Sequence, residues 1–214
     1  EDYNNSCIND VSNAVFTITE PAPNITVTYP NTAVTLYYNA TATISWTSEF
    51  TVSSFVNIEY SIDNGASWIT IASPTEDDGS YNWTVPATAS TQCLVRVSEY
   101  GNPAVFDVSN VNFTIAPPFV TVTYPNGGQT IEGCASANIT WTKGGTSSYY
   151  KIEYSIDNGS NWTVINSSYY TTGGSFTWSP VADFNSTQAL VRVSDANYPL
   201  ATGQSNAVFT LLKN

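Results

Sequence analysis

The side chains that could do chemistry in this chain are mostly carboxylates and tyrosines. The 214-residue sequence contains no histidine, and five lysines and arginines stand against 17 acidic residues. Nucleophilic catalysis needs a base beside the nucleophile or an environment that ionises a cysteine. Lys143 and Lys151 fall at strand-edge or solvent-facing positions, and Glu59 and Glu153 occupy equivalent outward positions in two repeats, as solvated strand residues do. We therefore predict that the chain is not an enzyme.

A short acidic run is the candidate for binding a metal ion. Glu76, Asp77 and Asp78 place hard oxygen ligands close together in one loop, which is the ligand type that Ca²⁺ prefers. The equivalent loop of the second repeat, at 170–173, carries no acid, and no EF-hand or cadherin-like spacing occurs. We expect no cofactor, and Ca²⁺ at residues 76–78 is the alternative.

Two nine-residue stretches predict hairpin tips: YSIDNGASW at 60–68 and YSIDNGSNW at 154–162. Asp-Asn-Gly supplies residues that tolerate positive φ in a tight turn. The pattern Ser-x-Asp-x-Gly-x-x-Trp resembles the Asp-box of sialidases and many secreted β proteins. The resemblance implies that the aspartate caps the turn and the tryptophan packs beneath it. The residues given this structural role are Asp63, Gly65, Asp157 and Gly159.

The chain is a tandem repeat of short predicted strands. They lie at 25–30, 41–47, 55–62, 67–72, 80–85, 93–98 and 111–115, and again at 120–125, 137–142, 150–156, 161–165, 175–179, 189–194 and 207–212. The six tryptophans fall in matched pairs, as expected for two copies of one core. Short alternating strands separated by turn signals are typical of a β-sandwich. The predicted fold is all-β, with two tandem Ig-like β-sandwich domains at 20–116 and 117–214.

Residues 1–19 end in an additional strand sequence that belongs to neither domain. DVSNAVFTIT at 10–19 returns as DVSNVNFTIA at 107–116, with Ala14, Phe16 and Ile18 on one face. A single strand has no ladder of its own, so we expect it to pair with a sheet edge by strand addition. The acceptor is a neighbouring subunit, which gives an open head-to-tail filament. The alternative is that residue 1 is a cut inside a longer array, and the strand belongs to a preceding module.

Several motifs together carry a resemblance to a known class of module. They are VTYPN near each start, the I-S/T-W strand, IEYSIDNG, STQ-x-LVRVS and SN-x-x-FT at each end. With them the chain resembles the tandem immunoglobulin-like or fibronectin-III-like modules of large secreted surface proteins of Bacteroidetes-type bacteria. The resemblance implies spacers, adhesive arms or filament subunits, located outside the cell or on its surface.

The charge and the sequons agree with that location. A net charge of −12 argues against nucleic acid and anionic lipid, which need basic patches, and no apolar window is long enough for a membrane span. An extracellular chain would expose its Asn-x-Ser/Thr sequons to glycosylation. The candidate acceptors are Asn4, Asn24, Asn39, Asn82, Asn112, Asn138, Asn158, Asn161, Asn166 and Asn185.

The three cysteines cannot all pair within one chain, and without CxxC spacing or histidine they do not form a zinc site. Cys93 and Cys134 lie at the two strands where immunoglobulin domains place their disulfide, but in different repeats. We predict that both are unpaired within their own domains and buried. Cys7 is the one best placed to reach outside its module.

The predicted function is a non-catalytic structural module of an extracellular filament, surface appendage or giant adhesin, whose partners are copies of itself or neighbouring repeats. The alternative is an accessory carbohydrate-binding module that contacts surface glycans. Its signal is three adjacent tyrosine pairs, at 37–38, 149–150 and 169–170. One ring of each pair should face outward in an extended segment, and exposed tyrosine can stack on sugars.

Overall fold

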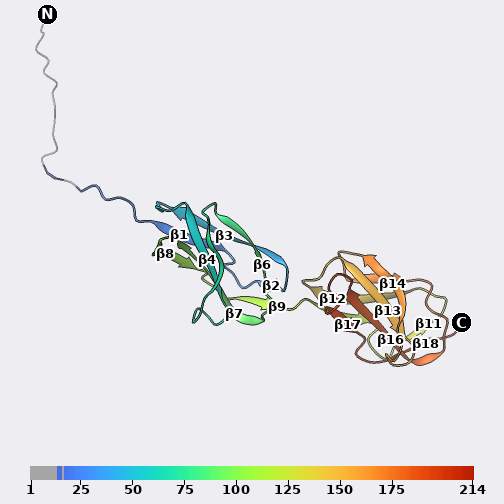
Figure 1. Ribbon diagram of the computed structural model, residues 1–214. Coiled ribbons are helices and arrows are strands. Elements are labelled where there is room, and N and C mark those ends of the chain that lie inside the picture. Colours follow the sequence, from blue (N-terminus) through green and yellow to red (C-terminus); the bar gives the residue numbers. More distant parts are fainter. Residues whose placement is uncertain (1–13, 16) are drawn as a thin grey trace, which may run out of the picture.

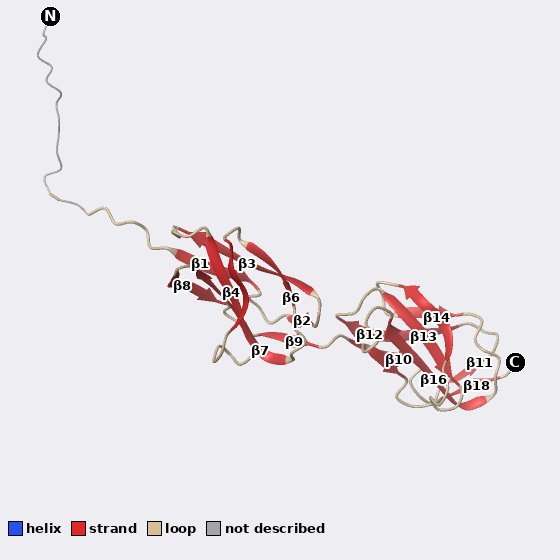
Figure 2. Ribbon diagram, viewed as in Figure 1, coloured by secondary structure: helices blue, strands red, loops and turns tan. Residues whose placement is uncertain are grey.

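Every regular element in the part of the chain that the structure describes is a β-strand. The computed structural model describes residues 14–15 and 17–214, and Figure 2 shows strands joined by loops throughout. The described residues include no apolar helix of membrane-spanning length. The fold is therefore all-β, as the alternation of apolar residues predicts.

Module 1 is a two-sheet sandwich. Its strands are β1 (Asn24–Tyr29), β2 (Thr35–Tyr37), β3 (Thr41–Glu49), β4 (Phe55–Ser61), β5 (Ile69–Glu76), β6 (Ser80–Thr84), β7 (Ser90–Glu99), β8 (Asn102–Val108) and β9 (Phe113–Ala116). One sheet has the order β1-β3-β6. The other sheet has the order β2-β9-β7-β4-β5, and its sixth strand, β8, also pairs with β7.

Module 2 repeats this arrangement strand for strand. Its strands are β10 (Phe119–Tyr124), β11 (Thr130–Glu132), β12 (Ala137–Gly144), β13 (Tyr149–Ser155), β14 (Thr163–Tyr170), β15 (Ser175–Trp178), β16 (Ser186–Asp195), β17 (Thr202–Gln204) and β18 (Phe209–Leu212). The sheets have the orders β10-β12-β15 and β11-β18-β16-β13-β14, and β17 pairs with β16. Both modules thus have the strand arrangement of Ig-like and fibronectin-III-like sandwiches.

Each module has its own core, filled by the inward residues of both sheets. In module 1 the side chains of Ile44, Ile58 and Phe113 are fully buried, and Trp83 packs beside Tyr60 with ring centroids 5.1 Å apart. The core of module 2 is a separate cluster built from the matched positions, with Trp178 beside Tyr154. Alternate residues of β3 and β4, such as Ile44 with Trp46 and Val56 with Ile58, point into the core of module 1. Since no buried cluster spans the modules, each sandwich supplies its own packing.

Two short strands in each module were not predicted. β2 and β11 have three residues each, too few to show alternation. β8 carries a proline at its second position and leaves most of its residues exposed or half-buried, and β17 is three residues long. These strands form because β9, β18, β7 and β16 offer them a partner.

The described residues of the predicted N-terminal strand are not in a strand in this isolated chain. Residues 14–15 and 17–23 precede β1 without regular structure, and Val15 and Ile18 are exposed. Residues 1–13 and Phe16 lie outside the described residues. Pairing with another molecule therefore stays a prediction.

The two modules lie end to end (Figure 1). The described part of the N-terminal segment leaves module 1 on the side away from module 2, and the C-terminus lies at the far end of module 2. β9 ends at Ala116 and β10 begins at Phe119, so only Pro117 and Pro118 connect the modules. The surfaces that could carry function are therefore the two open ends, the joint and the sheet faces.

Candidate functional site

The predicted hairpin tips hold their aspartates in closed hydrogen-bond networks. Asp63 Oδ1 accepts from the Ser67 amide at 2.9 Å and from the Ser61 hydroxyl at 2.7 Å, and Oδ2 accepts from the Ser67 hydroxyl at 2.5 Å. These bonds, that from the Ser67 side chain foremost, lower the pKa of Asp63 to about 2. Gly65 has φ of +86°, which only glycine adopts at little cost.

The second tip makes the same contacts with one substitution. Asn161 replaces serine and donates to Asp157 through both its amide groups, at 2.8 and 2.6 Å. The hydrogen bond from the Asn161 side chain is the main reason that the pKa of Asp157 falls to about 2. Gly159 has φ of +85°. Both carboxylates are occupied by their own turns, which leaves them no role as catalytic acids.

The tryptophan that ends each hairpin motif contributes to a stack on the outer sheet face of module 1 and module 2. In module 1, Arg96 lies over the ring of Trp68, 4.4 Å from its centroid, and its guanidinium donates to Glu59 at 2.6 and 2.9 Å. Glu59 on β4 and Arg96 on β7 are direct cross-strand partners. The tryptophan thus packs against an arginine as well as against its own hairpin, a contact that the sequence motif alone does not reveal.

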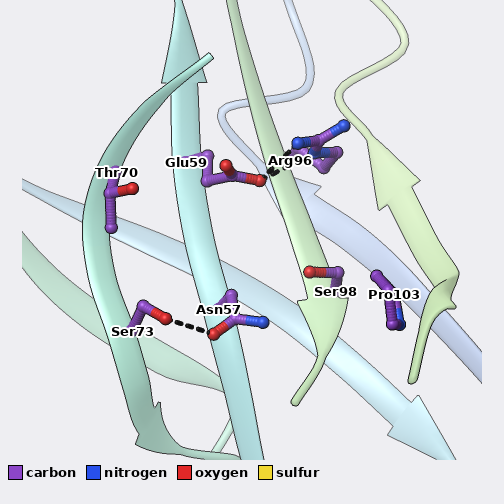
Figure 3. Close-up of a pocket in the computed structure, with 7 residues that line it drawn as sticks. All are labelled: Asn57, Glu59, Thr70, Ser73, Arg96, Ser98 and Pro103. Carbon is purple, nitrogen blue, oxygen red and sulfur yellow. Dashed lines mark hydrogen bonds and ion pairs between the residues drawn. The ribbon is translucent and has the colours of Figure 1, made fainter. Parts of the chain in front are cut away.

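A polar groove runs beside this stack in module 1 (Figure 3). Its volume is about 280 Å³. The lining residues are Asn57, Glu59, Thr70, Ser73, Arg96, Ser98 and Pro103. The Ser73 hydroxyl donates to Asn57 Oδ1 at 2.6 Å, and Glu59 points at Arg96. The groove holds a single carboxylate that is already paired, so its geometry does not assemble an acid–base pair.

Module 2 fills the corresponding position with a second cation. Lys151 stands where module 1 has Asn57, and its ammonium lies 2.7 Å from Glu153 Oε1, while Arg192 approaches Oε2 at 2.8 Å. Burial raises the pKa of Glu153, but the hydrogen bonds from Lys151 and Arg192 outweigh it and hold the pKa below its usual value. The prediction that Glu153 is a solvated strand residue is wrong, because only 3% of it is exposed beneath these two cations.

The acidic run proposed for Ca²⁺ is engaged in other contacts. Asp77 Oδ1 accepts from the Trp46 indole at 2.6 Å and the Ser48 hydroxyl at 2.7 Å, while Asp78 accepts from the Ser80 amide. Glu76 is exposed. Over residues 14–15 and 17–214 no three acidic, cysteine or histidine side chains gather as a metal site would require. Ca²⁺ binding at these residues stays an untested prediction.

An aromatic contact joins the two modules. The ring of Tyr37, at the end of β2, lies directly against the backbone of Gly144 and Gly145, where any Cβ would overlap it. Its centroid is 6.5 Å from that of Phe119, at the start of module 2. Gly145 has φ of +65°, so a side chain there would be strained as well as obstructed. This contact was not predicted from the sequence, although the adjacent glycines at the end of β12 are a feature that could have indicated it.

The tyrosine pairs proposed for sugar binding separate into buried and exposed rings. Tyr150 is fully buried and Tyr149 is 44% exposed. Tyr149 packs beside Tyr170, which is 59% exposed, with centroids 5.2 Å apart. Tyr169 instead packs against Phe176 and is half-buried. Of these tyrosine pairs, the rings that form an exposed contact are therefore Tyr149 with Tyr170.

Each module also has a groove along its open side, between the outer edges of its two sheets. In module 1 it has a volume of about 320 Å³ and lies between β5 and β6. In module 2 it has a volume of about 390 Å³ and lies between β14 and β15. Among the described strands, β6 pairs only with β3 and β15 only with β12, so each groove has an unpaired strand edge.

The two described cysteines are unpaired, and the prediction that both are buried holds for one of them. Cys93 is fully buried, and this burial raises the pKa of its thiol. Cys134 is exposed because it occupies a tight turn before β12 with φ of +60°, as does its counterpart Asn39 in module 1. Cys7 lies outside the described residues.

The described sequons are accessible to different degrees. Asn112 and Asn166 are half-buried, and Asn4 lies outside the described residues. Exposed asparagines are Asn24, Asn39, Asn82, Asn138, Asn158, Asn161 and Asn185. Of the predicted subunit-contact residues, Ala14 and Ile18 are exposed, and Phe16 lies outside the described part of the chain.

Comparison with known proteins finds relatives in structure only. No protein family and no curated protein sequence matches the chain. Among solved structures, the fibronectin(III)-like modules of Clostridium thermocellum CbhA match at 16% identity and a TM-score of 0.29, covering 87% of this chain and 94% of theirs. The I9–I11 tandem of titin matches at 15% identity and 0.42, covering 89% and 66%. Sidekick-1 immunoglobulin domains 1–5 match at 11% identity and a TM-score of 0.41, and this chain spans 40% of the length of that protein chain.

Proposed function

We propose that this chain is a non-catalytic structural segment of an extracellular filament, surface appendage or large adhesin. In it, copies or neighbouring repeats are joined head-to-tail by β-strand addition. The observation that carries the proposal is the joint, in which Tyr37 rests on Gly144 and Gly145 across a two-residue proline connection. Two prolines with fixed φ and a ring seated on two glycines leave the joint little freedom, as a load-carrying spacer needs.

The polar chemistry of the described residues supports a structural role. The titratable groups with the strongest contacts, Asp63, Asp157 and Glu153, bind neighbouring donors of their own modules. Glu99 accepts from the backbone amides of Val52 and Ser53. Each of these groups holds a turn or a sheet face in place. The negative net charge favours solubility and separation of the chains outside the cell.

Strand addition is supported by the sequence of residues 10–19. Positions 16 and 18 correspond to Phe113 and Ile115 of β9, which module 1 buries almost completely. The same two residue types in a segment before β1 would be costly to leave in water. A strand that adds to another molecule would bury them and would also satisfy its backbone groups.

The experiment that tests this proposal measures the mass of the full chain over a wide concentration range by light scattering. We expect species at multiples of the chain mass. The double variant Phe16→Asp, Ile18→Asp should weaken association about tenfold or more, because it places charge on the strand face that must be buried. Val15→Asp, on the opposite face of the same segment, is the matched control and should change association less than about twofold. A wild-type chain that stays single at all concentrations would contradict the proposal.

A second candidate function is binding of surface glycans, favoured by the exposed rings of Tyr149 and Tyr170. Two adjacent exposed rings can stack on a sugar. Module 1 has Phe55 opposite Glu76 at the same positions, so the aromatic pair is specific to module 2. Saturable signal on a glycan array, lost in Tyr149→Ala and Tyr170→Ala and retained in Phe55→Ala, would support this function. An array without saturable signal would exclude it for the glycans present.

A further inference from the structure

The groove on the open side of module 2 has walls suited to receive a strand. We propose that it is the acceptor for residues 10–19 of a second copy of this chain, an inference that rests on the head-to-tail association proposed above. One wall is the outer edge of β15 and the other is β14, and neither strand has a second neighbour among the described residues. Unpaired strand edges present free backbone N–H and C=O groups to an incoming strand.

The floor of this groove is apolar and partly open. Tyr154 and Trp178 stack at its base with centroids 5.1 Å apart, and the half-buried Phe176 of β15 also lines it. The lining residues are Tyr154, Thr163, Val164, Ile165, Phe176, Trp178, Ser179, Pro180 and Ala182. A strand paired with β15 would place every second side chain over these rings. The groove therefore matches a donor whose apolar residues alternate.

Module 1 offers the same kind of groove, but its size and its lining favour module 2 as the acceptor. Tyr81 on β6 pairs with the buried Ile44, and Phe176 on β15 pairs with the buried Ile139, so module 1 lines its groove with a phenol hydroxyl that module 2 lacks. Asn82 also lines the groove of module 1 and is an exposed sequon asparagine. A glycan there would obstruct the edge of β6. The groove of module 2, at about 390 Å³, is also larger than the 320 Å³ of module 1.

The donor segment has the sequence that these modules bury as a strand. SNAVFT at 12–17 is identical to residues 205–210, which lead into β18 of module 2. In β18, Phe209 and Leu211 are almost completely buried, and they correspond to Phe16 and Ile18. The described Ile18 is 84% exposed in the isolated chain. Ile18 thus matches a position that each module buries, although it is itself exposed before β1.

Chain geometry makes the contact intermolecular. Only residues 20–23 separate the donor from β1, and four residues span at most about 14 Å. Module 1 lies between this segment and the groove of module 2 (Figure 1). The donor of one copy therefore pairs with module 2 of the next, and this contact leaves a free donor and a free acceptor at the two ends. Such a heterologous contact extends into an open chain.

The test measures association of the full chain carrying Thr163→Asp, at a residue that pairs with Tyr154 and lines the groove, or, as the matched control, Ile69→Asp, at the residue that pairs with Tyr60 in module 1. Both positions are exposed, so both variants should fold, which thermal unfolding verifies. We expect Thr163→Asp to weaken association about tenfold or more, because it buries a charge under the donor strand, and Ile69→Asp to change it less than about twofold. Equal effects of the two substitutions would overturn the assignment to module 2.

A photoreactive amino acid at position 18 gives an independent measurement. We expect crosslinks between copies to residues 163–166 or 175–180. Crosslinks concentrated in module 1 would overturn the inference, and so would association that survives Thr163→Asp, although head-to-tail association itself would stand. A wild-type chain that never associates would overturn both this inference and the proposed strand addition.

Discussion

Module 1 and module 2 share a strand order and the stack of tryptophan, arginine and glutamate, but they differ in how they complete their polar contacts. Module 1 pairs Glu59 with one cation, and module 2 surrounds Glu153 with two. Side-chain exposure falls from 21% for Glu59 to 5% for Glu153. The comparison indicates that the two copies keep one strand order while the polar contacts on the outer sheet face differ between them.

The matched tryptophans Trp46 and Trp141 differ in the other direction, because here module 1 has the more complete hydrogen bonding. Trp46 donates its indole N–H to Asp77 at 2.6 Å. Trp141 Nε1 is the one buried side-chain nitrogen or oxygen left without a partner within residues 14–15 and 17–214. Thr171 occupies the backbone position of Asp77, since both amides bond the matched serine carbonyl of the preceding loop. Module 2 thus lacks a carboxylate where module 1 uses one.

The ends of the modules differ most. Tyr37 can lie on Gly144 and Gly145 only because neither glycine has a side chain. Module 1 has Glu49 and Phe50 at the same place, and Phe50 is 61% exposed. A tyrosine contact of the same form therefore cannot recur at the free end of module 1. The joint is specific to the order in which these two modules occur.

The largest effect should come from removing a matched core tryptophan. Trp178→Ala should destabilise module 2 by about 3–5 kcal/mol, through lost burial and the cavity that remains. Module 1 should keep its own transition, because the cores are separate clusters. Trp83→Ala is the reciprocal variant. Chemical unfolding monitored by tryptophan fluorescence checks both, and transitions that always shift together would show that the modules fold as one unit.

The next largest change in the free energy of unfolding is expected from removing the charge of Glu153, which pairs with Lys151 and Arg192. Glu153→Gln should cost about 1–3 kcal/mol, because it leaves Lys151 and Arg192 beside an uncharged group that is almost buried. The matched Glu59→Gln should cost about 0–1 kcal/mol, since its single partner is more exposed to solvent. Urea denaturation of each variant gives the two values. A larger cost in module 1 would contradict the comparison.

The sequence predicted the two sandwiches because their cores follow strict alternation, as Ile44 and Trp46 illustrate. It also located both hairpin tips, whose turn residues act locally. It could not predict that Lys151 covers Glu153, because alternation assigns a face and says nothing about what lies over it. The contact of Tyr37 with Gly145 joins residues far apart in the chain, and no periodicity reports such a pair. The prediction that Cys134 is buried was wrong because this residue lies in a turn with positive φ before β12.

A smaller change in stability is expected from altering the hydrogen-bond acceptors of the Trp46 and Trp141 indole N–H groups. Asp77→Ala should destabilise module 1 by about 1–2 kcal/mol, since it removes the acceptor from Trp46 and Ser48. Thr171→Asp should stabilise module 2 by about 1 kcal/mol, by supplying an acceptor to Trp141. Thermal unfolding of both variants measures the changes. Thr171→Asn is the uncharged control, and no gain with either side chain would show that position 171 does not reach the indole.

The smallest effect is the acid dependence of the hairpin tips. Hydrogen bonds lower the pKa of Asp63 and Asp157 from 3.8 to about 2 in the folded chain. Their stabilising contribution is therefore complete above about pH 4 and is lost as the pH falls from 3.8 towards 2. Melting temperatures between pH 5 and pH 2 should fall less steeply in Asp63→Asn and Asp157→Asn than in the wild type. An unchanged slope in both variants would contradict this assignment.

The path of the chain through each sandwich also determines how tension would act on it. The chain enters module 1 at the start of β1 and leaves from the end of β9, at the opposite end of the sandwich (Figure 1). β9 lies parallel to β2 and antiparallel to β7, and β1 lies antiparallel to β3. A pull along the long axis loads these hydrogen bonds in shear, so that several must break at once. Forced unfolding is governed by that barrier, and we expect each module to resist extension as a unit and to rupture separately from its neighbour.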